Sequence, residues 1–517
     1  MARELSGRFQ VSLVWEGALV GLAAGLVVTL YRLSLMGAER VLRVATGASA
    51  GSLPLMLVWI AVVAVALLLV GRLMLWEPAT QGSGIPQVDA EIMGKLDMPW
   101  ARVLPAKFLE GTLCTFAGLS MGREGPSVQL GGVAGKAVSR LLRRRRGEER
   151  LLVTCGAASG MAAAFHAPLT GIMFALEELR KTFSAPLIIS LMSSCVVADY
   201  VCSQALGLEP TLSLLVVEYI PHGWYALVVL LGLLMGVFGA THNLGMFCAQ
   251  DLFCRIRRHA PYTRLLLPFA LSTVCAFLVP QLTCGGDEIL ELLERPQSLT
   301  ALGLIALLAG KYLLTTICFG SGAPGGTLFP LVTMGALAGA LYGLVAARAF
   351  GLDMVLVSNF MLLGIAGLFS AVVRAPVTAV VLVFELTGDL QALLSAAIVS
   401  VLAYVTANLL KVDAFYEHLL ARLLGTSAEE TSKTRRGNDQ VLTTFVVEPG
   451  SELEGRYLGD VRIPGRALVV TVSRHGQDFV PDADTRLEMS DKVVLLTDAH
   501  SSDEAESFMR GACSGKL

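Results

Sequence analysis

The sequence predicts an all-α polytopic membrane protein followed by a small α/β domain. The 517-residue chain is 54% hydrophobic and only 16% charged, with a mean hydropathy of +0.65, whereas a soluble protein carries about a quarter charged residues. Apolar stretches of about 18 residues, enough to cross a bilayer, recur up to about residue 410, for example at Leu53–Val70, Trp224–Gly239 and Leu302–Phe319. Beyond them the chain turns polar and strand-like.

Composition narrows the class of protein further. The net charge of −2 and the lack of a basic, aromatic-interleaved patch argue against a nucleic-acid partner. The apolar run Val11–Leu30 lacks a small-residue cleavage site and is long for a signal peptide, so we expect the first transmembrane helix there. The ten cysteines are scattered singly without metal-ligand spacing. We therefore expect no metal and no other cofactor.

Three glycine-rich segments each run into a proline: GSGIP (82–86), GREGP (122–126) and GGTLFP (325–330). Glycine frees the backbone and proline suits the first turn of a helix. We therefore expect helices that begin within the membrane, with unpaired N–H groups and the positive dipole end exposed, which is the chemistry of an anion site. Ser83 adds a hydroxyl donor, although a simple helix cap is the alternative for this residue.

Arg123 and Glu124 are ionisable residues placed between apolar stretches. A charge at membrane depth is costly and usually marks a functional site. Glu124 carries a negative charge of its own at a helix start, so it could occupy the place that an anion would otherwise take. The alternative is a soluble loop with a buried ion pair.

The next segment predicts a broken helix. Arg140–Arg150 is the most basic run of the chain, which places it in the cytoplasm by the positive-inside rule. Leu151–Leu179 is interrupted at 165–168, and broken helices occur at membrane depth only where they are buried or line a cavity. It ends in the carboxylate pair Glu177 and Glu178, near the cytoplasmic mouth. Solvation at a helix end is the alternative for both.

Further elements are expected along the rest of the chain. We predict spans at about 186–205, 223–247, 264–281 and 299–319, a helix over Leu331–Val345, a second broken segment at Gly364–Glu385, a last span at Leu390–Leu410 and an amphipathic helix over Lys411–Leu424 that leads to the cytoplasm.

The two halves of this region form an internal sequence repeat. A repeat with interrupted hydrophobic segments at corresponding positions is the sequence sign of a secondary transporter, whose helix starts converge near the midplane. Because the convergent ends here are positive, the substrate should be an anion. No arginine fork suits a carboxylate or phosphate, so a small monovalent anion fits best. The correspondences, about 205 residues apart, are 166–170 with 374–378, 122–126 with 326–330, Glu177 with Glu385 and Gly131 with Gly335.

In this order and over this span, GSGIP, GREGP, GGTLFP and the HAPLTG…EE hairpin resemble the ClC family of chloride channels and chloride/proton antiporters. The resemblance covers residues 10–425 or so. It implies an inverted-repeat helical bundle that is homodimeric, with a separate anion pore in each subunit. It also implies that chloride and protons are the transported ions and that the chain lies in a lipid bilayer.

The resemblance also assigns roles to single residues. Ser83 matches the serine that coordinates the central anion, and serine rather than proline there points to chloride over nitrate. Glu124 matches the external gating glutamate, Tyr416 the tyrosine of the inner gate, and Glu178 the internal proton-transfer glutamate of antiporters. Leu328 stands where phenylalanine is usual, which should alter the hydrophobic constriction. The full expected anion site is Ser83, Gly122, Arg123, Glu124, Gly125, Thr327, Leu328 and Tyr416.

The tail has a different character. Residues 426–440 are polar and predict a linker between a transport domain at 1–425 and a regulatory domain at 441–517. Strand-like runs are Thr443–Val447, Ala467–Ser473 and Lys492–Leu496. The pattern V-x-P-G-S-E-L-E-G-R resembles the TrkA C-terminal domain of potassium-transport systems. This implies a prokaryotic source and a possible small-molecule ligand, although no glycine-rich phosphate loop names one.

These observations favour a chloride/proton antiporter that is not an enzyme. A passive anion channel and a fluoride exporter are the alternatives of the same fold. A membrane-embedded hydrolase could use Glu177 and Glu178 as an acid/base pair, but a nucleophile, a metal cluster and polar substrate contacts are all missing from the sequence. We expect a multi-pass protein of the prokaryotic plasma (inner) membrane, with its N-terminus and its C-terminal domain in the cytoplasm.

Overall fold

The computed structural model describes residues 7–207, 220–293, 300–388, 392–426, 440–465, 467–474, 477–498 and 502–514. The chain divides between Leu424 and Gly425 into two compact units. The described part of the first unit is helical, and the second holds a four-stranded sheet. The predicted fold class, an all-α membrane region followed by a small α/β domain, is confirmed.

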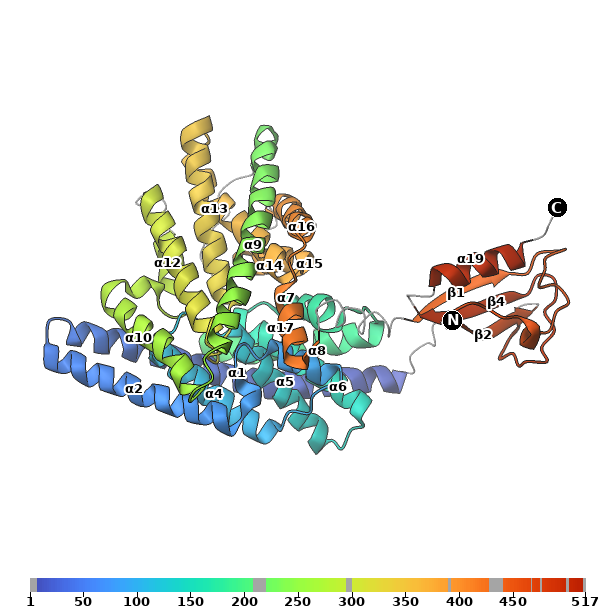
Figure 1. The fold of residues 1–517 in the computed structure, drawn as a ribbon, viewed down its shortest axis with the longest axis horizontal. Helices are drawn as coiled ribbons and strands as arrows, with labels where there is room; N and C mark the ends of the chain where they lie inside the picture. Colours follow the sequence, from blue (N-terminus) through green and yellow to red (C-terminus); the bar gives the residue numbers. More distant parts are fainter. Residues whose placement is uncertain are drawn as a thin grey trace. The chain divides into compact units, whose positions relative to one another are not determined.

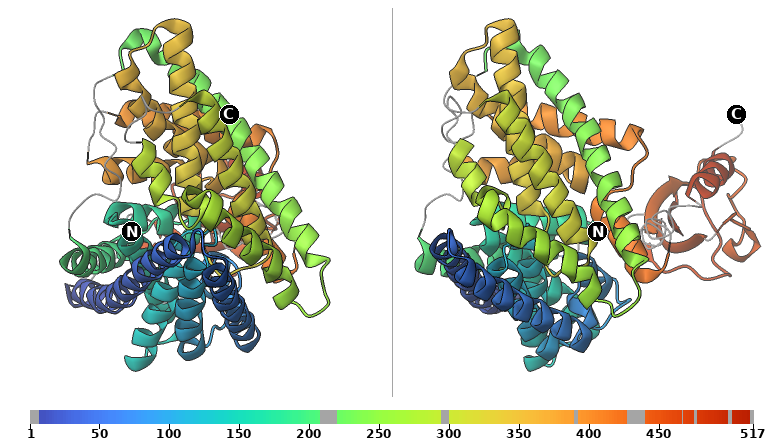
Figure 2. Two further views of the ribbon diagram at one scale, coloured as in Figure 1. Left: turned by 90° about the vertical axis from the view of Figure 1, so that its left-hand side faces the viewer. Right: turned by 60° about the vertical axis from the view of Figure 1, so that its left-hand side comes forward.

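The first half of the membrane region is made of long helices and shorter ones. They are α1 (Gly7–Ser49), α2 (Leu53–Trp76), α3 (Ile85–Ile92), α4 (Trp100–Phe116), α5 (Glu124–Leu141), α6 (Arg146–Phe165), α7 (Pro168–Phe174) with the π-helical turn Ala175–Arg180, and α8 (Ala185–Leu206). Figures 1 and 2 show these helices, coloured blue to teal, gathered on one side of the unit.

The second half repeats this arrangement. Its helices are α9 (Tyr225–Cys254), α10 (Tyr262–Leu278), α11 (Asp287–Leu293), α12 (Ala301–Gly320), α13 (Leu328–Phe350), α14 (Val357–Val373), α15 (Pro376–Thr387), α16 (Leu393–Leu409) and α17 (Phe415–Leu424). Helices α12 to α16 lie on the other side of the unit (Figures 1 and 2). Seven helices of the described residues are long and apolar enough to cross a membrane.

Several elements differ by a few residues from their predicted bounds, and the differences at α1 and α17 affect the packing. Helix α1 continues past the predicted end at Leu30 to Ser49, because no proline interrupts the chain before Pro54. Helix α17 begins at Phe415 and buries Phe415, Tyr416 and Leu420. The amphipathic segment predicted at Lys411–Leu424 is therefore shorter than expected, and its apolar face is packed into the bundle.

Glycines allow the central helices to touch. A Cβ atom on Gly131 of α5 would overlap the carbonyl oxygen of Gly156 on α6, and a Cβ on Gly335 of α13 would be 2.9 Å from the carbonyl oxygen of Gly364 on α14. Small residues at such crossings let helix backbones approach closely in membranes. The same close crossing occurs in both halves, at positions separated by the repeat spacing.

The second unit is a small antiparallel sheet with one helix, α19 (Ser502–Cys513). Its strands β1 (Gln440–Val446), β2 (Ala467–Arg474), β3 (Gln477–Phe479) and β4 (Lys492–Asp498) lie in the order β1-β4-β2-β3. The Arg474 guanidinium donates to both carboxylate oxygens of Asp491, at 2.9 and 2.7 Å, and these bonds raise the pKa of Arg474. The three predicted strands are present, whereas β3 was not predicted because it is short and fully exposed.

Most of the predicted linker lies outside the described residues, which resume at Gln440. The core of the second unit includes Phe445, Val472, Val493, Leu495 and Met509. Because these side chains come from both the sheet and α19, the unit has a hydrophobic core of its own.

Candidate functional site

Three helices begin where the glycine- and proline-rich segments predicted. Helix α3 follows Gly84, whose φ of +95° favours glycine, and Pro86 lies in its first turn. Helix α5 begins at Glu124 and helix α13 at Leu328. The first N–H groups of each helix have no partner within the helix, so each start can donate hydrogen bonds to a ligand.

The loops that precede these helices are hydrogen-bonded to one another. The Gly122 amide donates to the Gly326 carbonyl at 2.7 Å, and the Gly326 amide donates to the Gly122 carbonyl at 2.8 Å. Gly82 pairs in the same way with the loop before α13, donating to Gly322 at 3.1 Å and accepting from Gly325 at 3.1 Å. The two halves of the chain therefore meet through backbone hydrogen bonds. The Gly122 amide, which was expected in the anion site, donates its hydrogen bond to Gly326 instead.

Four polar atoms converge next to this loop pairing without a hydrogen-bond partner of their own. They are the Ser83 hydroxyl, the Tyr416 hydroxyl and both carboxylate oxygens of Glu124, all of them buried. Ser83 lies against Gly125, because a Cβ there would be 2.5 Å from its Oγ. Buried polar groups are normally hydrogen-bonded, so a group of unpartnered ones indicates a site for a ligand.

Tyr416 closes the site from α17. Its side chain is 1% exposed, and its hydroxyl has Ser83 and Thr327 as neighbours. The rings of Phe174 and Phe415 pack edge-on against it, with centroids 6.3 and 5.3 Å away. Aromatic packing fixes the ring, so the hydroxyl is held in place beside Ser83.

Thr327 and Leu328 stand at the start of α13, where they were expected. Leu328 is 1% exposed and contributes to the hydrophobic core. The Arg123 guanidinium lies 4.8 Å from the centroid of the Phe329 ring and 3.9 Å from Asp287, the first residue of α11. A direct contact between Arg123 and an anion stays a prediction.

Glu177 and Glu385 bind the helix starts of opposite halves. The Glu177 carboxylate accepts from the amides of Val377 and Thr378 and from the Thr378 hydroxyl, at 3.1, 2.8 and 2.8 Å. The Glu385 carboxylate accepts the corresponding three bonds at 2.7, 2.6 and 2.7 Å, from Leu169 and Thr170. Each carboxylate thus caps a positive helix end, which is a structural role.

Glu178 is placed quite differently from its neighbour. It is 2% exposed in the π-helical turn Ala175–Arg180, and Lys181 lies 4.0 Å from its carboxylate. Short π-helical segments occur often at functional sites. Glu178 also lies within electrostatic range of the Tyr416 hydroxyl, as Glu124 does. The two glutamates are therefore both near the candidate anion site.

The sequence model of the family described as voltage gated chloride channel matches residues 62–408, more than half of the 517 residues. The chain belongs to this family. A second model, the TrkA-C domain, matches residues 442–510. The sequence-based assignment of both parts is confirmed.

Relatives of the voltage gated chloride channel family align over most of the chain. The H(+)/Cl(-) exchange transporter ClcA of Vibrio cholerae serotype O1 (strain M66-2) is 35% identical over 425 residues, which cover 80% of this chain and 90% of the relative. A solved structure of a slow cyanobacterial Cl−/H+ antiporter matches with a TM-score of 0.76 at 30% identity, over 80% of this chain and 98% of that one. A CLC-type fluoride/proton antiporter, with a TM-score of 0.64 and 21% identity over the same shares, supports the fold alone.

Sequence reasoning missed a buried lysine that holds the loop before Ser83. Lys107 on α4 is fully buried, and its ammonium donates to the carbonyls of Thr80 and Gly82, both at 2.7 Å. Gln129 donates to the Ala79 carbonyl at 2.8 Å. These bonds fix the loop that leads to Ser83. A lysine within an apolar helix is itself the signal that could have revealed this role.

Lys311 on α12 is the counterpart of Lys107 in the second half, at the repeat spacing. It is also fully buried, and it donates to the carbonyls of Cys284 at 2.8 Å and Leu282 at 3.2 Å. Each half of this voltage gated chloride channel fold therefore uses a buried lysine to hold the loop before a short helix. The repeat extends beyond the motifs from which it was predicted.

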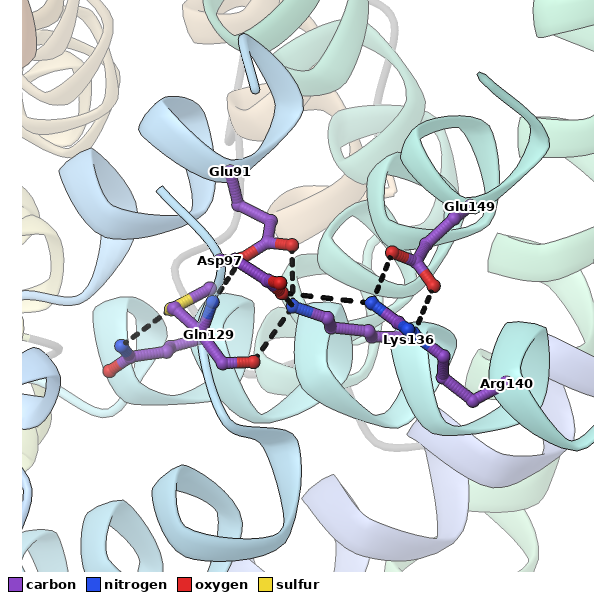
Figure 3. Close-up of polar contacts among 7 residues, drawn as sticks. Glu91, Asp97, Gln129, Lys136, Arg140 and Glu149 are labelled. Atoms are coloured by element: carbon purple, nitrogen blue, oxygen red, sulfur yellow. Dashed lines mark hydrogen bonds and ion pairs between the residues drawn. The ribbon is translucent and has the colours of Figure 1, made fainter. Parts of the chain in front are cut away.

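A third buried lysine sets the position of α3 against α5. Figure 3 shows the Lys136 ammonium among carboxylates: it donates to Glu91 at 2.6 Å and to Asp97, while Arg140 pairs with Glu149 at 2.5 Å. The bond from Lys136 holds the pKa of the loop residue Asp97 below its usual value. The network connects α3 and α5, whose N-terminal ends face the candidate anion site. It therefore holds these two helix ends close together before any ligand binds.

Proposed function

We propose that this protein exchanges chloride for protons across the membrane, with one anion pathway in each chain. The observation that carries the proposal is the meeting of Ser83, Tyr416 and Glu124 at the start of three helices. Among the described residues, their buried oxygen atoms make no hydrogen bond of good geometry. Positive helix ends and hydroxyl donors suit a small bare anion, and the relatives with the highest identity above are named as exchangers of H+ and Cl−.

Chloride would be held by hydroxyl and amide donors. The Ser83 and Tyr416 hydroxyls would donate from two sides, and the amides at the starts of α5 and α13 would complete the site. Thr327 and Leu328 would contribute through their backbone, so the replacement of phenylalanine by Leu328 would leave this donor unchanged. The neutral donors explain why a monovalent anion fits better than a carboxylate or phosphate, which favour a guanidinium fork.

Glu124 would couple the anion to the proton. Its carboxylate lies at the first turn of α5, against Gly122 and Gly326. While charged it is attracted by the helix end, and it competes there with chloride. When protonated it loses that attraction and leaves the site open. Glu178 would exchange protons with the other side of the membrane, by a route separate from the anion.

Two basic runs of the sequence and one ion pair support a cytoplasmic side for the tail. The basic run Arg140–Arg150 connects α5 to α6, and Arg255–Arg258 follows α9; both are cytoplasmic by the positive-inside rule. Asp251 near the end of α9 pairs with Arg422 of α17 at 2.7 Å. Helix α17 would therefore end on the cytoplasmic side, where the C-terminal domain follows. The N-terminus would lie on the same side, and the membrane would be the plasma membrane of a prokaryote.

Flux measurements in liposomes test the proposal. An outward chloride gradient should drive proton uptake against the proton gradient by the wild-type protein. Glu124→Gln should carry chloride without protons and without pH dependence, because the amide imitates the protonated acid. Glu178→Gln should also stop proton movement, while its chloride flux stays pH-sensitive. If chloride flux by the wild type never moves protons uphill, the protein is a passive channel and the exchange proposal fails.

Substrate and assembly need separate measurements. Chloride should carry the coupled flux; fluoride-driven proton movement that exceeds chloride-driven movement would instead support a fluoride exporter of the same fold. We propose a homodimer, and light scattering of the purified protein in detergent should give twice the mass of the chain. A small-molecule ligand of the C-terminal domain stays a prediction.

A further inference from the structure

The cytoplasmic end of the proton route contains one ammonium group between two carboxylates. Lys181 ends the π-helical turn with a φ of +52°. Its Nζ lies 4.0 Å from the Glu178 carboxylate and pairs with Glu417 on α17. Its side chain is about one third exposed, at 32%, while that of Glu178 is 2% exposed. A half-buried cation therefore faces a buried carboxylate on one side and a more exposed one on the other.

Glu417 directly follows the tyrosine of the candidate anion site. Helix α17 carries both Tyr416 and Glu417 on its first turn. Two ion pairs connect α17 to the rest of the bundle, and they lie next to different groups. Glu417 pairs with Lys181, next to Glu178, whereas Arg422 pairs with Asp251 on α9 at 2.7 Å.

We propose that Lys181 is a positioning residue that links the protonation of Glu178 to the helix that carries Tyr416. The inference rests on the proposed exchange function and adds a connection between its proton side and its anion side. When Glu178 is charged, Lys181 is attracted by both carboxylates. When Glu178 takes up a proton, that attraction is lost, so Lys181 interacts more strongly with Glu417 and holds the first turn of α17 more firmly.

Other ionisable groups lie on the elements packed against the π-helical turn. On α17 the Tyr416 hydroxyl is within electrostatic range of Glu178. On α3, which packs against the π-helical turn, Glu91 is paired with Lys136, and Asp89 is buried. Arg180, on the turn itself, lies within electrostatic range of Cys155 and of the like-charged Arg150 on α6. Lys181 lies 4.0 Å from the Glu178 carboxylate and favours its charged form.

Two single substitutions should act in opposite directions. Lys181→Gln removes the cation that favours the charged form of Glu178, so the pH at which proton-coupled flux is half-maximal should rise by about half a pH unit. Glu417→Gln removes a carboxylate that competes for Lys181, so the same midpoint should fall. In the Lys181→Gln background, Glu417→Gln should lower the midpoint by less than it does in the wild type, because the shared cation is gone. Fluxes are measured in liposomes with the same pH on both sides, so the orientation of the protein does not matter.

The opposite signs separate this role from a simple tether. If the ion pair only anchored α17, both variants would lose the same contact and shift the midpoint in the same direction, and the inference would be overturned. Arg422→Gln is the matched control, because it breaks the other anchor of α17 and should leave the midpoint unchanged. An equal shift in this control would also refute a specific role of Lys181. Absence of proton coupling in the wild type would instead reject the proposed function.

Discussion

Glu177 and Glu178 are adjacent in the chain, but the structure predicts different effects when each is changed to glutamine: a loss of stability for Glu177 and a loss of proton coupling for Glu178. Glu177→Gln keeps the shape of the side chain but replaces one carboxylate oxygen by an amide group, which faces an N–H donor of the opposite helix start. Of the three bonds at 3.1, 2.8 and 2.8 Å, at least one is lost. A hydrogen bond to a charged group contributes about 1.5–3 kcal/mol.

The lost charge at the start of α15 adds a further contribution. A carboxylate at a helix N-terminus is stabilising by about 0.3–1 kcal/mol, so the sum is about 2–4 kcal/mol. Because this end of the hairpin is partly exposed, we expect the lower value. Thermal unfolding of the purified protein in detergent should show a reduced Tm for Glu177→Gln and a similar reduction for its repeat counterpart Glu385→Gln.

Function gives the second readout of the same variants. Glu177→Gln should retain proton-coupled chloride flux, since its carboxylate binds backbone amides rather than a proton route. Glu178→Gln should retain the wild-type Tm and lose proton coupling. The reasoning is refuted if Glu177→Gln melts like the wild type, or if it abolishes coupling while Glu178→Gln does not.

Three further predictions concern the anion site and the tail. Ser83→Pro removes the hydroxyl donor and should shift the flux preference from chloride toward nitrate; equal relative fluxes in the two proteins would remove Ser83 from the site. Gly326→Ala places a Cβ 2.8 Å from the Glu124 carboxylate and should displace it, so the pH dependence of chloride flux should weaken, and an unchanged pH profile would contradict this placement. A chain truncated after Gly425 should still fold and transport chloride with altered activity, because the first unit is compact by itself; loss of all flux from a folded truncation would show that the tail is needed for transport.

Much of the membrane region could be predicted from the sequence because its signals are local. Apolar runs of sufficient length require helices in a bilayer, where every backbone group must be satisfied internally. Glycine and proline mark the starts of α3, α5 and α13 without any knowledge of their neighbours. The repeat spacing then indicated that the two halves have corresponding parts, and the motifs carried the family resemblance.

The contacts between those halves could be decided only by the tertiary structure. Nothing local indicates that Glu177 caps the helix that follows Ala375, or that Lys107 reaches the carbonyls of Thr80 and Gly82. Such partners lie 25 to 201 residues apart, and a long polar side chain has many possible acceptors at that range. Burial selects among them, because in a packed bundle each charged group must find the partner that the fold brings within reach.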